Sequence, residues 1–385
     1  MADPTGPSPG AGRPRVGMVG GGQLARMTQQ AAVDLDVDLS VLATSPDEPA
    51  VEAGAHLVKG SPDDPVALRD FAGECDVVTF DHEGVPPELL AELEAEGLLF
   101  APPAAAKLFA QDKAVARERL GELGFPVPPN RLATSVGEVE EFGEGHGWPV
   151  IAKAPRGGYD GRGVWELESA AEADPILGGL EGGLLLEPKL DLTREIAVIT
   201  ARRPGGESVT WPVVETVQKD AMCRELIVPA RSEPATLEEA SALGHSIAEA
   251  IGAVGLVAVE LFETPDGLFV NELALRPHNS GHFSIEGSVT SQFEQHLRAV
   301  LDWPLGSTAP TAPAVVTINV VGPEDGSDPR DRIPEALGVD RAHLHIYGKE
   351  ARPGRKLGHV TALADTVEEA HRIASDAVGI LEGGA

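Results

Sequence analysis

A glycine-rich stretch in the first half of the chain has the composition of a phosphate-binding loop. It reads GGYDGRG at residues 157–163 and follows an apolar strand, PVIAK, that ends at Lys153. Four glycines in seven residues let backbone N–H groups approach phosphate oxygens closely. A flexible hairpin tip would also be rich in glycine, but it would tolerate Ser or Asn where this stretch carries Tyr, Asp and Arg. We therefore interpret the stretch as a flap over a ligand, with the candidate binding residues Lys153, Gly158, Tyr159, Asp160, Gly161, Arg162 and Gly163.

Two carboxylates lie on strands that a tight turn joins into a hairpin. Glu260 belongs to VAVELF and Glu272 to FVNELAL, and a Pro-Asp-Gly turn at residues 265–267 connects them. Exposed carboxylates are common on strands, but Glu260 has apolar neighbours on both sides, where an unpaired carboxylate would be costly. Carboxylate oxygens, with Asn271 beside one of them, are ligands that Mg²⁺ uses when it also holds substrate phosphates. The hairpin therefore predicts a magnesium site at Glu260 and Glu272.

The first apolar run, VGMVGGGQLARM at residues 16–27, contains the pattern GxGxxA after a strand. This pattern is compatible with a dinucleotide-binding turn, although any tightly packed turn from strand to helix favours glycine. The acidic residue that would bind a ribose is expected at the end of the second strand, where the sequence has Thr44 and Ser45. We therefore disfavour a nicotinamide cofactor, and expect the helix N-terminus and Gln23 to face another anion.

The net charge of −31 limits which partners the chain can bind. It argues against nucleic acid and anionic membranes, whose phosphates would be repelled. Against this background, YGKEARPGRKLGH places four cations within eight residues around a Pro-Gly turn. A run of charges usually faces water, but a turn that folds cations towards one point also suits a clamp on a substrate phosphate. The candidate clamp residues are Lys349, Arg355 and Lys356.

The composition is that of a soluble protein with more than one domain. The 385 residues, 42% of them hydrophobic, can fill two or three cores, and no apolar run approaches the length of a membrane span. Only two cysteines occur, without metal-ligand spacing, which suits a reducing cytoplasm. Residues 1–14 are rich in Gly, Pro and Ser, and we interpret them as a disordered leader.

Alternating apolar strands and helices predict a parallel sheet at the start of the chain. Strands are expected at residues 15–20, 37–43 and 75–80, with helices near 23–34 and 65–72. A helical connection is expected over residues 102–124. From residue 148 onward, strands joined by turns predict antiparallel pairing, with one clear helix at 236–251, and a Pro-containing stretch at 303–313 precedes a smaller α/β segment. The predicted fold class is α/β, with parallel and antiparallel (α+β) parts.

These motifs together resemble the ATP-grasp superfamily. Besides the flap and the acidic hairpin, the resemblance rests on EPKL at residues 187–190, Glu195 and RPHNSGH at residues 276–282. GGYDGRG combined with NELALRPHNSGH and the late YGKEARPGRKLGH is similar to one family within it, the N5-carboxyaminoimidazole ribonucleotide synthases. The match runs from about Arg15 to the C-terminal tail. It implies a Rossmann-like N-terminal domain at 15–106, an ATP-grasp domain at 107–305 with subdomains at 107–186 and 187–305, and a C-terminal domain at 306–385.

The resemblance also implies a role for each matching residue. The cations on the ATP phosphates would be Lys107 and Lys153, and the Mg²⁺ ligands Glu260 and Glu272. Adenine and ribose would be bound by Glu187, Pro188, Lys189, Leu190 and Glu195, and further ATP contacts would come from Asn271 and from Gln218, which stands where the family commonly has histidine. The ribonucleotide would be bound by Gln23, Tyr159, Lys349, Arg355, Lys356 and Asp81, the last replacing a glutamate frequent in the family. The catalytic candidates are Asp160, Arg162, Arg276 and His278.

The implied reaction is the carboxylation of 5-aminoimidazole ribonucleotide with ATP and bicarbonate, through carboxyphosphate, in purine biosynthesis. Asp160 or His278 would accept the amine proton, and the sequence does not rank them. The family also implies a homodimer. Other ATP-grasp ligases, such as formate-dependent glycinamide ribonucleotide transformylase or D-alanine ligase, would share the ATP and Mg²⁺ residues but lack the flap and basic motifs. A non-catalytic nucleotide-binding module would not need both metal carboxylates.

Overall fold

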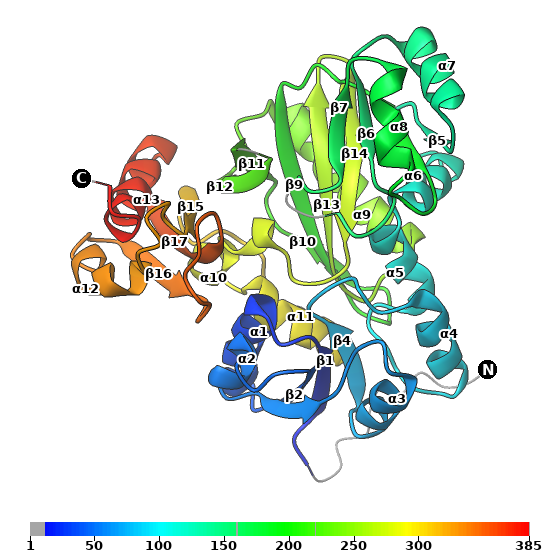
Figure 1. Cartoon of the computed structure of the whole chain (residues 1–385). Coiled ribbons are helices and arrows are strands. Elements are labelled where there is room, and N and C mark those ends of the chain that lie inside the picture. Colours follow the sequence, from blue (N-terminus) through cyan, green and yellow to red (C-terminus); the bar gives the residue numbers. More distant parts are fainter. Residues whose placement is uncertain (1–11, 159–160, 220, 385) are drawn as a thin grey trace.

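The computed structural model describes residues 12–158, 161–219 and 221–384, which form three β-sheets (Figure 1). The first sheet is parallel, with strand order β3-β2-β1-β4. Its elements are β1 (Arg15–Val19), α1 (Gln23–Asp34), β2 (Asp38–Ala43), α2 (Pro49–Glu52), β3 (His56–Lys59), α3 (Pro65–Gly73), β4 (Val77–Phe80) and α4 (Pro87–Ala95). The strands and helices predicted for this segment are confirmed, with α2, β3 and α4 as additions. Most of the predicted leader, residues 1–11, lies outside the described residues.

Two helices lead from the parallel sheet to the rest of the protein. α5 (Ala104–Gln111) and α6 (Lys113–Glu122) occupy the segment that is predicted as one helical connection. Asp112 separates them because its side chain accepts hydrogen bonds from the N–H groups of Ala114 and Val115, at 3.0 and 3.1 Å, and so caps α6. This cap fixes Lys113 in the first turn of α6.

A small antiparallel sheet carries the glycine-rich flap. Its strand order is β5-β8-β6-β7. It is built from β5 (Arg131–Ala133), α7 (Val136–His146), β6 (Val150–Lys153), β7 (Val164–Leu167), η1 (Ala170–Ala173), α8 (Asp174–Leu177) and β8 (Leu184–Pro188). The flap joins β6 to β7, and the N–H of Ala154 donates to the carbonyl of Gly163 at 2.8 Å across its base. The predicted hairpin around the flap is therefore present.

The third sheet is the centre of the molecule, with order β14-β13-β9-β11-β12-β15-β17-β16 and β10 paired to β9. Its first part comprises β9 (Arg194–Arg202), β10 (Ser208–Thr210), β11 (Val214–Lys219), β12 (Met222–Val228), α9 (Pro234–Ala250), β13 (Gly255–Thr264) and β14 (Gly267–Ala274). After β14 come η2 (Asn279–Gly281), α10 (Ser284–Gly287) and α11 (Gln292–Val300). None of the helices in the described part of the chain is long and apolar enough to cross a membrane.

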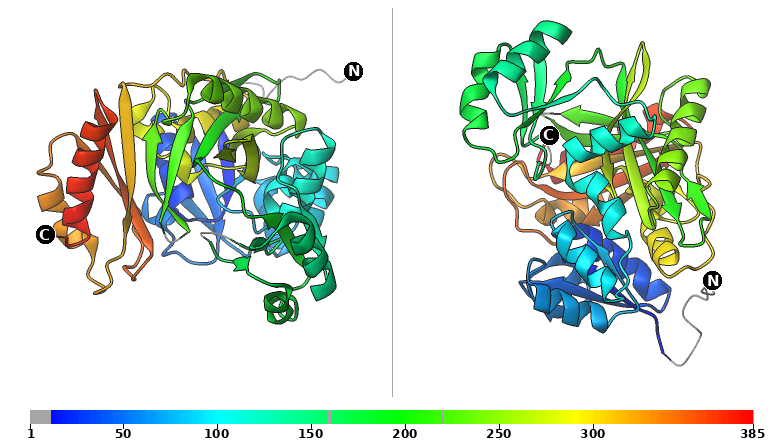
Figure 2. Two further views of the ribbon diagram at one scale, coloured as in Figure 1. Left: turned by 90° about the horizontal axis from the view of Figure 1, so that it is seen from above. Right: turned by 90° about the vertical axis from the view of Figure 1, so that its right-hand side faces the viewer.

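The C-terminal segment continues the central sheet, whereas the sequence suggests a segment set apart by the stretch at 303–313. It comprises β15 (Ala314–Val321), η3 (Pro329–Arg332), α12 (Ile333–Ala336), β16 (Ala342–Ile346), β17 (Lys356–Ala364) and α13 (Val367–Leu381). β15 pairs antiparallel with β12, so hydrogen bonds run without interruption into the C-terminal strands (Figures 1 and 2). Local periodicity could not show this, because the two paired strands are separated by α9 and the β13–β14 hairpin.

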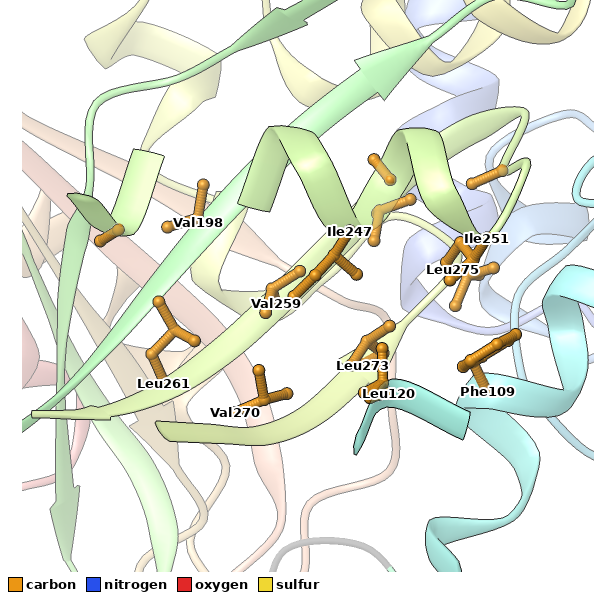
Figure 3. Close-up of a cluster of buried hydrophobic side chains, with 14 of the residues drawn as sticks. Phe109, Leu120, Val198, Ile247, Ile251, Val259, Leu261, Val270, Leu273 and Leu275 are labelled. Carbon is orange, nitrogen blue, oxygen red and sulfur yellow. The ribbon is translucent and has the colours of Figure 1, made fainter. Parts of the chain in front are cut away.

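A hydrophobic core holds α9 against the strands that carry the acidic hairpin (Figure 3). Ile247 of α9 belongs to the same buried cluster as Val259 of β13 and Leu273 of β14. Gly244 permits the close approach of the helix, because a Cβ atom there would lie 2.5 Å from a methyl carbon of Val198 on β9. The acidic hairpin therefore rests on a rigid layer.

Alanine substitutions at two helical glycines test this packing. Gly244→Ala should destabilise the protein by about 1–3 kcal/mol, because its methyl group would overpack the contact with Val198. Gly379→Ala in α13 should stabilise it by roughly 0.5–1 kcal/mol, because alanine favours the helix and a Cβ there meets nothing within 4 Å. The measurement is urea unfolding of both variants. Stabilisation by both substitutions would contradict the packing of α9.

Candidate functional site

A buried ion triad lies where the small sheet and α6 meet the central sheet. The carboxylate of Glu187 on β8 binds Arg117 of α6 at 2.5 Å (Oε1 to Nε) and Lys153 of β6 at 2.6 Å (Oε2 to Nζ). All three side chains are buried, and Glu187 is only 2% exposed. Burial raises the pKa of Glu187, but the charges of Arg117 and Lys153 outweigh burial and hold this pKa below its ordinary value. Burial lowers the pKa of Lys153, and Glu187 opposes that shift.

A chain of polar contacts runs from this triad to the end of the acidic hairpin. Lys153 Nζ donates to Asn271 Oδ1 at 3.1 Å, and Asn271 Nδ2 donates to Glu260 Oε2 at 3.3 Å. The other oxygen of Glu260, Oε1, lies 3.5 Å from Nε2 of His278. Residues that the sequence assigns to ATP, to metal and to catalysis thus belong to one connected network.

The two predicted metal ligands face each other across the hairpin. Glu260 on β13 is paired in register with Glu272 on β14. Burial first, and then the nearby carboxylates of Glu272 and Glu195, raise the pKa of Glu260 to about 8. Lys113 Nζ forms an ion pair with Glu272. This concentration of carboxylate oxygens favours a hard cation such as Mg²⁺.

Protein side chains alone do not complete such a metal site. Within the described ranges, no group of three or more His, Cys, Asp or Glu side chains is arranged to hold a metal ion. A pair of carboxylates with few other protein ligands fits Mg²⁺, which typically keeps several waters and shares its coordination with substrate phosphates. The residues present therefore fit this metal only together with a phosphorylated ligand.

Lys107, which the sequence places on the ATP phosphates, is enclosed by the N-terminal part of the molecule. Its side chain is 0% exposed, and its Nζ donates to Glu83 Oε2 at 2.7 Å and to the carbonyl of His82 at 3.1 Å. The same ammonium lies 4.2 Å from the ring centroid of Phe80. Arg276 also approaches Glu83, at 3.2 Å. The charge of Lys107 is therefore used within the fold, and Lys113 lies at the acidic hairpin.

Sequence reasoning missed Lys113 and Arg117, although α6 carries a signal for the first of them. Asp112 marks a helix start, which puts Lys113 in the first turn. A cation in that turn opposes the helix dipole, so a lysine there is more easily explained by an external partner. Arg117 gives no such signal, because its position on the buried face of α6 depends on tertiary packing.

Close contacts or a positive φ require glycine at flap positions 158, 161 and 163. A Cβ atom at Gly158 would lie 2.7 Å from the carbonyl oxygen of Arg162. Gly161 has a φ of +75°, and a Cβ there would lie 2.4 Å from Cβ of Ala221 in the β11–β12 turn. Gly163 also has a positive φ, of +76°. Tyr159 and Asp160 lie outside the described residues.

The predicted adenine and ribose residues follow one another along β8 and β9. β8 ends at Pro188, and Lys189 beyond it pairs with Glu166 of β7 at 2.6 Å. Leu190 follows Lys189 in the connection to β9. Glu195 lies on β9, and Gln218 Nε2 of β11 donates to its carboxylate at 3.4 Å. Burial raises the pKa of Glu195. Gln218, which stands in place of a histidine, thus contacts the predicted ribose-binding carboxylate.

The loop between β16 and β17 comes close to α1 and α2, since a Cβ atom at Gly348 would lie 2.6 Å from Glu52 Oε2 and 3.3 Å from Arg26 Nη1. Gln23 is the first residue of α1, and the N–H of Gly22 donates to Asp81 Oδ2 at 2.5 Å. Burial and the charge of Asp81 raise the pKa of Glu48, while Lys349 lowers it, so all three charges lie close together. The loop between β16 and β17 therefore brings Lys349 to the N-terminal domain.

The other cations of this loop face in different directions. Arg355 Nη1 donates to the carbonyl of Glu350 at 3.1 Å, and Arg352 pairs with the Glu350 carboxylate at 2.5 Å. The charge of Lys356 lowers the pKa of both Glu260 and His278, so this ammonium acts electrostatically on both side chains.

The hydrogen bonds of His278 fix which ring nitrogen carries the proton. Its Nδ1 accepts from the backbone N–H of Ser280 at 3.3 Å and lies 2.8 Å from the hydroxyl of Ser280. The proton of the neutral ring is then on Nε2, the atom that faces Glu260. Burial, with the charges of Arg276 and Lys356, lowers the pKa of His278 to about 3.

Removal of the central charge of the triad should be costly. Glu187→Gln would leave Arg117 and Lys153 buried without a counter-charge, and we expect a loss of about 3–5 kcal/mol in the free energy of unfolding. Because the pKa of Glu187 is held low, its contribution should be present at neutral pH and disappear as the pH falls through that pKa.

Glu166→Gln is the matched control, because Glu166 also pairs with a lysine at 2.6 Å but at the surface. Its loss should stay below about 1 kcal/mol, as for exposed ion pairs. Denaturant unfolding at neutral pH measures both variants. Equal losses in the free energy of unfolding would show that burial does not make the ion pairs of Glu187 more important than the surface pair of Glu166.

Comparison with known protein families divides the chain into three matching parts. Residues 14–111 match the ribonucleotide synthetase preATP-grasp domain, and residues 118–293 match the ATP-grasp domain. Residues 315–373 match the phosphoribosylaminoimidazole carboxylase C-terminal domain. The order of these domains agrees with the parallel sheet, the flap-bearing and acidic strands, and the C-terminal extension of the central sheet.

Similar proteins cover nearly the whole chain. The N5-carboxyaminoimidazole ribonucleotide synthase of Mycobacterium bovis is 47% identical over 372 residues, which cover 92% of this chain and 85% of the relative. The crystal structure of N5-carboxyaminoimidazole ribonucleotide synthetase from Thermus thermophilus has a TM-score of 0.85 at 37% identity, covering 95% of this chain and 98% of that one. N5-carboxyaminoimidazole synthase from Aspergillus clavatus, in complex with ADP and 5-aminoimidazole ribonucleotide, has a TM-score of 0.88 at 32% identity, covering 96% and 99%. The chain therefore belongs to the N5-carboxyaminoimidazole ribonucleotide synthase family of ATP-grasp enzymes.

Proposed function

We propose that the chain converts 5-aminoimidazole ribonucleotide, bicarbonate and ATP into N5-carboxyaminoimidazole ribonucleotide, ADP and phosphate, a step of purine biosynthesis. The observation that carries this proposal is the continuous network from Glu187 through Lys153, Asn271 and Glu260 to His278. It joins residues suited to a nucleotide, a metal and an acceptor in one site. Family membership supports the same activity.

The ATP side of the site is assigned to residues from both sheets. Backbone groups of residues 187–190 bind adenine, and Glu195 with Gln218 binds the ribose. Lys113 and Lys153 provide the positive charge at the phosphates, with the flap above them. Lys113 takes this role in place of Lys107, because the ammonium of Lys107 is enclosed by Glu83 and the carbonyl of His82.

Mg²⁺ would be held by Glu260 and Glu272 together with phosphate oxygens. When bound, the metal would neutralise negative charge that develops on the γ-phosphoryl group during its transfer. Asn271 orients Glu260 through its amide. The ammonium of Lys113, now paired with Glu272, would be available to the phosphates once another cation neutralises that carboxylate.

Bicarbonate is a poor electrophile, so it is first phosphorylated by ATP to carboxyphosphate. Transfer depends mainly on positioning and charge neutralisation by the surrounding lysines and arginines. Carboxyphosphate is hydrolysed readily, and closure of the flap would exclude water. It then breaks down to CO₂ and phosphate, and the exocyclic amine of the ribonucleotide attacks CO₂ to form the new C–N bond, losing a proton.

The acceptor is bound between the start of α1 and the basic loop. Gln23 at the helix N-terminus and Lys349 are assigned to one part of the ribonucleotide, and Lys356, whose charge acts on Glu260 and His278, is assigned to another. His278 carries its proton on Nε2, the nitrogen that lies 3.5 Å from Glu260 Oε1, so it does not accept the amine proton at that atom. Of the two candidates, this leaves Asp160 as the proton acceptor, and Arg162 and Arg276 as neutralising cations.

The proposal extends to the setting of the enzyme. The reaction uses only small molecules, and the strong negative charge of the chain disfavours nucleic acid as a partner. The low cysteine content supports a location in the cytoplasm. The family resemblance alone supports a homodimer.

The most direct test is ADP release by the purified protein. We expect release to require 5-aminoimidazole ribonucleotide and bicarbonate together, with the carboxylated product trapped and identified by mass spectrometry. ADP release that instead required formate and glycinamide ribonucleotide would replace this function by that of the related transformylase.

Two separate substitutions of lysine by methionine test which lysine binds the ATP phosphates. Lys113→Met should raise the KM for ATP by about 10–100-fold, because a charge-assisted contact contributes roughly 1.5–3 kcal/mol. Lys107→Met should lower stability, since it leaves Glu83 with fewer buried counter-charges, but it should leave the KM for ATP of the folded enzyme unchanged. Steady-state kinetics and thermal unfolding measure both. A raised KM for ATP in Lys107→Met, with an unchanged KM in Lys113→Met, would instead assign Lys107 to the ATP phosphates.

A further inference from the structure

One buried amide holds the backbone on which His278 lies. Gln292, the first residue of α11, is 0% exposed. Its Oε1 accepts from the N–H of His278 at 2.9 Å, and its Nε2 donates to the carbonyl of His278 at 2.8 Å. Both polar groups of one residue's backbone are therefore bound by a single side chain. Because a donor and an acceptor are engaged together, only one orientation of the amide satisfies the arrangement.

The surrounding chain leaves space for this amide and fixes it from a second side. A Cβ atom at Gly281 would lie 2.4 Å from Gln292 Oε1, so the glycine admits the side chain. The N–H of Gln292 donates to Ser284 Oγ at 2.8 Å, and that hydroxyl donates to the carbonyl of Gly281 at 2.6 Å. The segment 278–284 is thus wrapped around Gln292.

The same amide reaches the C-terminal strands through a stack of rings. Gln292 Nε2 also lies 3.1 Å from Nδ1 of His282, and the His282 ring stacks on His359 of β17 with centroids 4.9 Å apart. His359 Nδ1 lies 2.8 Å from the hydroxyl of Tyr347, which is 1% exposed. Tyr347 comes two residues before Lys349, and β17 begins at Lys356. The loop with the candidate phosphate cations therefore shares a buried framework with His278.

We propose that Gln292 is a positioning residue for the carboxylation step: it holds His278 against Glu260 and in register with the basic loop that binds the ribonucleotide. The inference rests on the proposed function. Its consequence is that loss of the Gln292 amide misplaces the acceptor end of the site while ATP binding, which uses other elements, is retained. Carboxyphosphate would then be formed but captured less often.

The chain supplies a matched control on the same helix. Gln295 is also 0% exposed, and it binds one residue in the same two-sided way: Nε2 donates to the carbonyl of Gly306 and Oε1 accepts from its N–H, both at 2.8 Å. Gly306 belongs to the segment after α11 and carries no candidate site residue. Substitution of Gln295 therefore removes the same two-sided bond to one backbone residue without touching His278, and only the Gln292 contact to His282 has no counterpart.

The experiment compares Gln292→Met with Gln295→Met, both of which keep side-chain volume. Each should lower the melting temperature, because buried polar groups lose their partners. Gln292→Met should also lower the carboxylated product formed per ADP released by at least about 10-fold, as expected for a misplaced reacting group. Its KM for ATP should not change, and Gln295→Met should keep the wild-type ratio of product to ADP. Equal ratios in the two variants would overturn the proposal.

Two further measurements keep the proposal separate from the proposed function. Gly281→Ala should lower the same ratio with Gln292 intact, because the new methyl group displaces its amide. The ring resonances of His278, identified by their absence in His278→Asn, should shift in Gln292→Met and not in Gln295→Met. Unshifted His278 resonances in Gln292→Met would refute the positioning role, whether or not the wild type forms carboxylated product. A wild type that forms no carboxylated product would refute only the proposed function.

Discussion

The proposed ATP side of the site depends on the burial of one carboxylate, Glu187, between two cations. A buried carboxylate is costly unless it is fully paired, so Glu187 needs both Arg117 and Lys153 as partners. These three residues come from α6, β6 and β8, and the triad therefore fixes a helix against the small sheet. Both cations also bind Asn271, Lys153 at its side chain and Arg117 at its carbonyl, at 3.1 and 2.5 Å. The small sheet is thereby tied to the acidic hairpin.

Charged side chains within the site form ion pairs with one another, and a bound substrate could take the place of one partner in each pair. Lys113 binds Glu272, and burial, together with the nearby carboxylates of Glu272 and Glu195, raises the pKa of Glu260. When substrate binds, a metal ion would neutralise the carboxylates, and the phosphates of the nucleotide would neutralise the lysines. In a chain with a net charge of −31, the proposed exchange of partners would allow an anionic nucleotide to bind locally.

Much of the fold and the site follows from local sequence. The βαβ order, the flap and the acidic hairpin were predictable because short-range periodicity and glycine spacing determine them. The continuation of the central sheet into β15 was not, since strand partners far apart leave no local pattern. For the same reason Lys107 and Lys113, only six residues apart, could not be distinguished: helix α5 directs the first to Glu83, and the cap at Asp112 directs the second to Glu272. Gln292 is likewise recognisable only from its contacts.

We infer that the carboxylates of the acidic hairpin hold their metal only together with the nucleotide, because Lys113 neutralises Glu272 until phosphates are present. Binding of Mn²⁺, measured by electron paramagnetic resonance with and without a non-hydrolysable ATP analogue, tests it most directly. We expect the analogue to tighten Mn²⁺ binding by at least about tenfold, equivalent to roughly 1.4 kcal/mol, and Lys113→Met to tighten it without nucleotide. Equal Mn²⁺ affinity of the wild type with and without the analogue would show that Lys113 does not control the metal site.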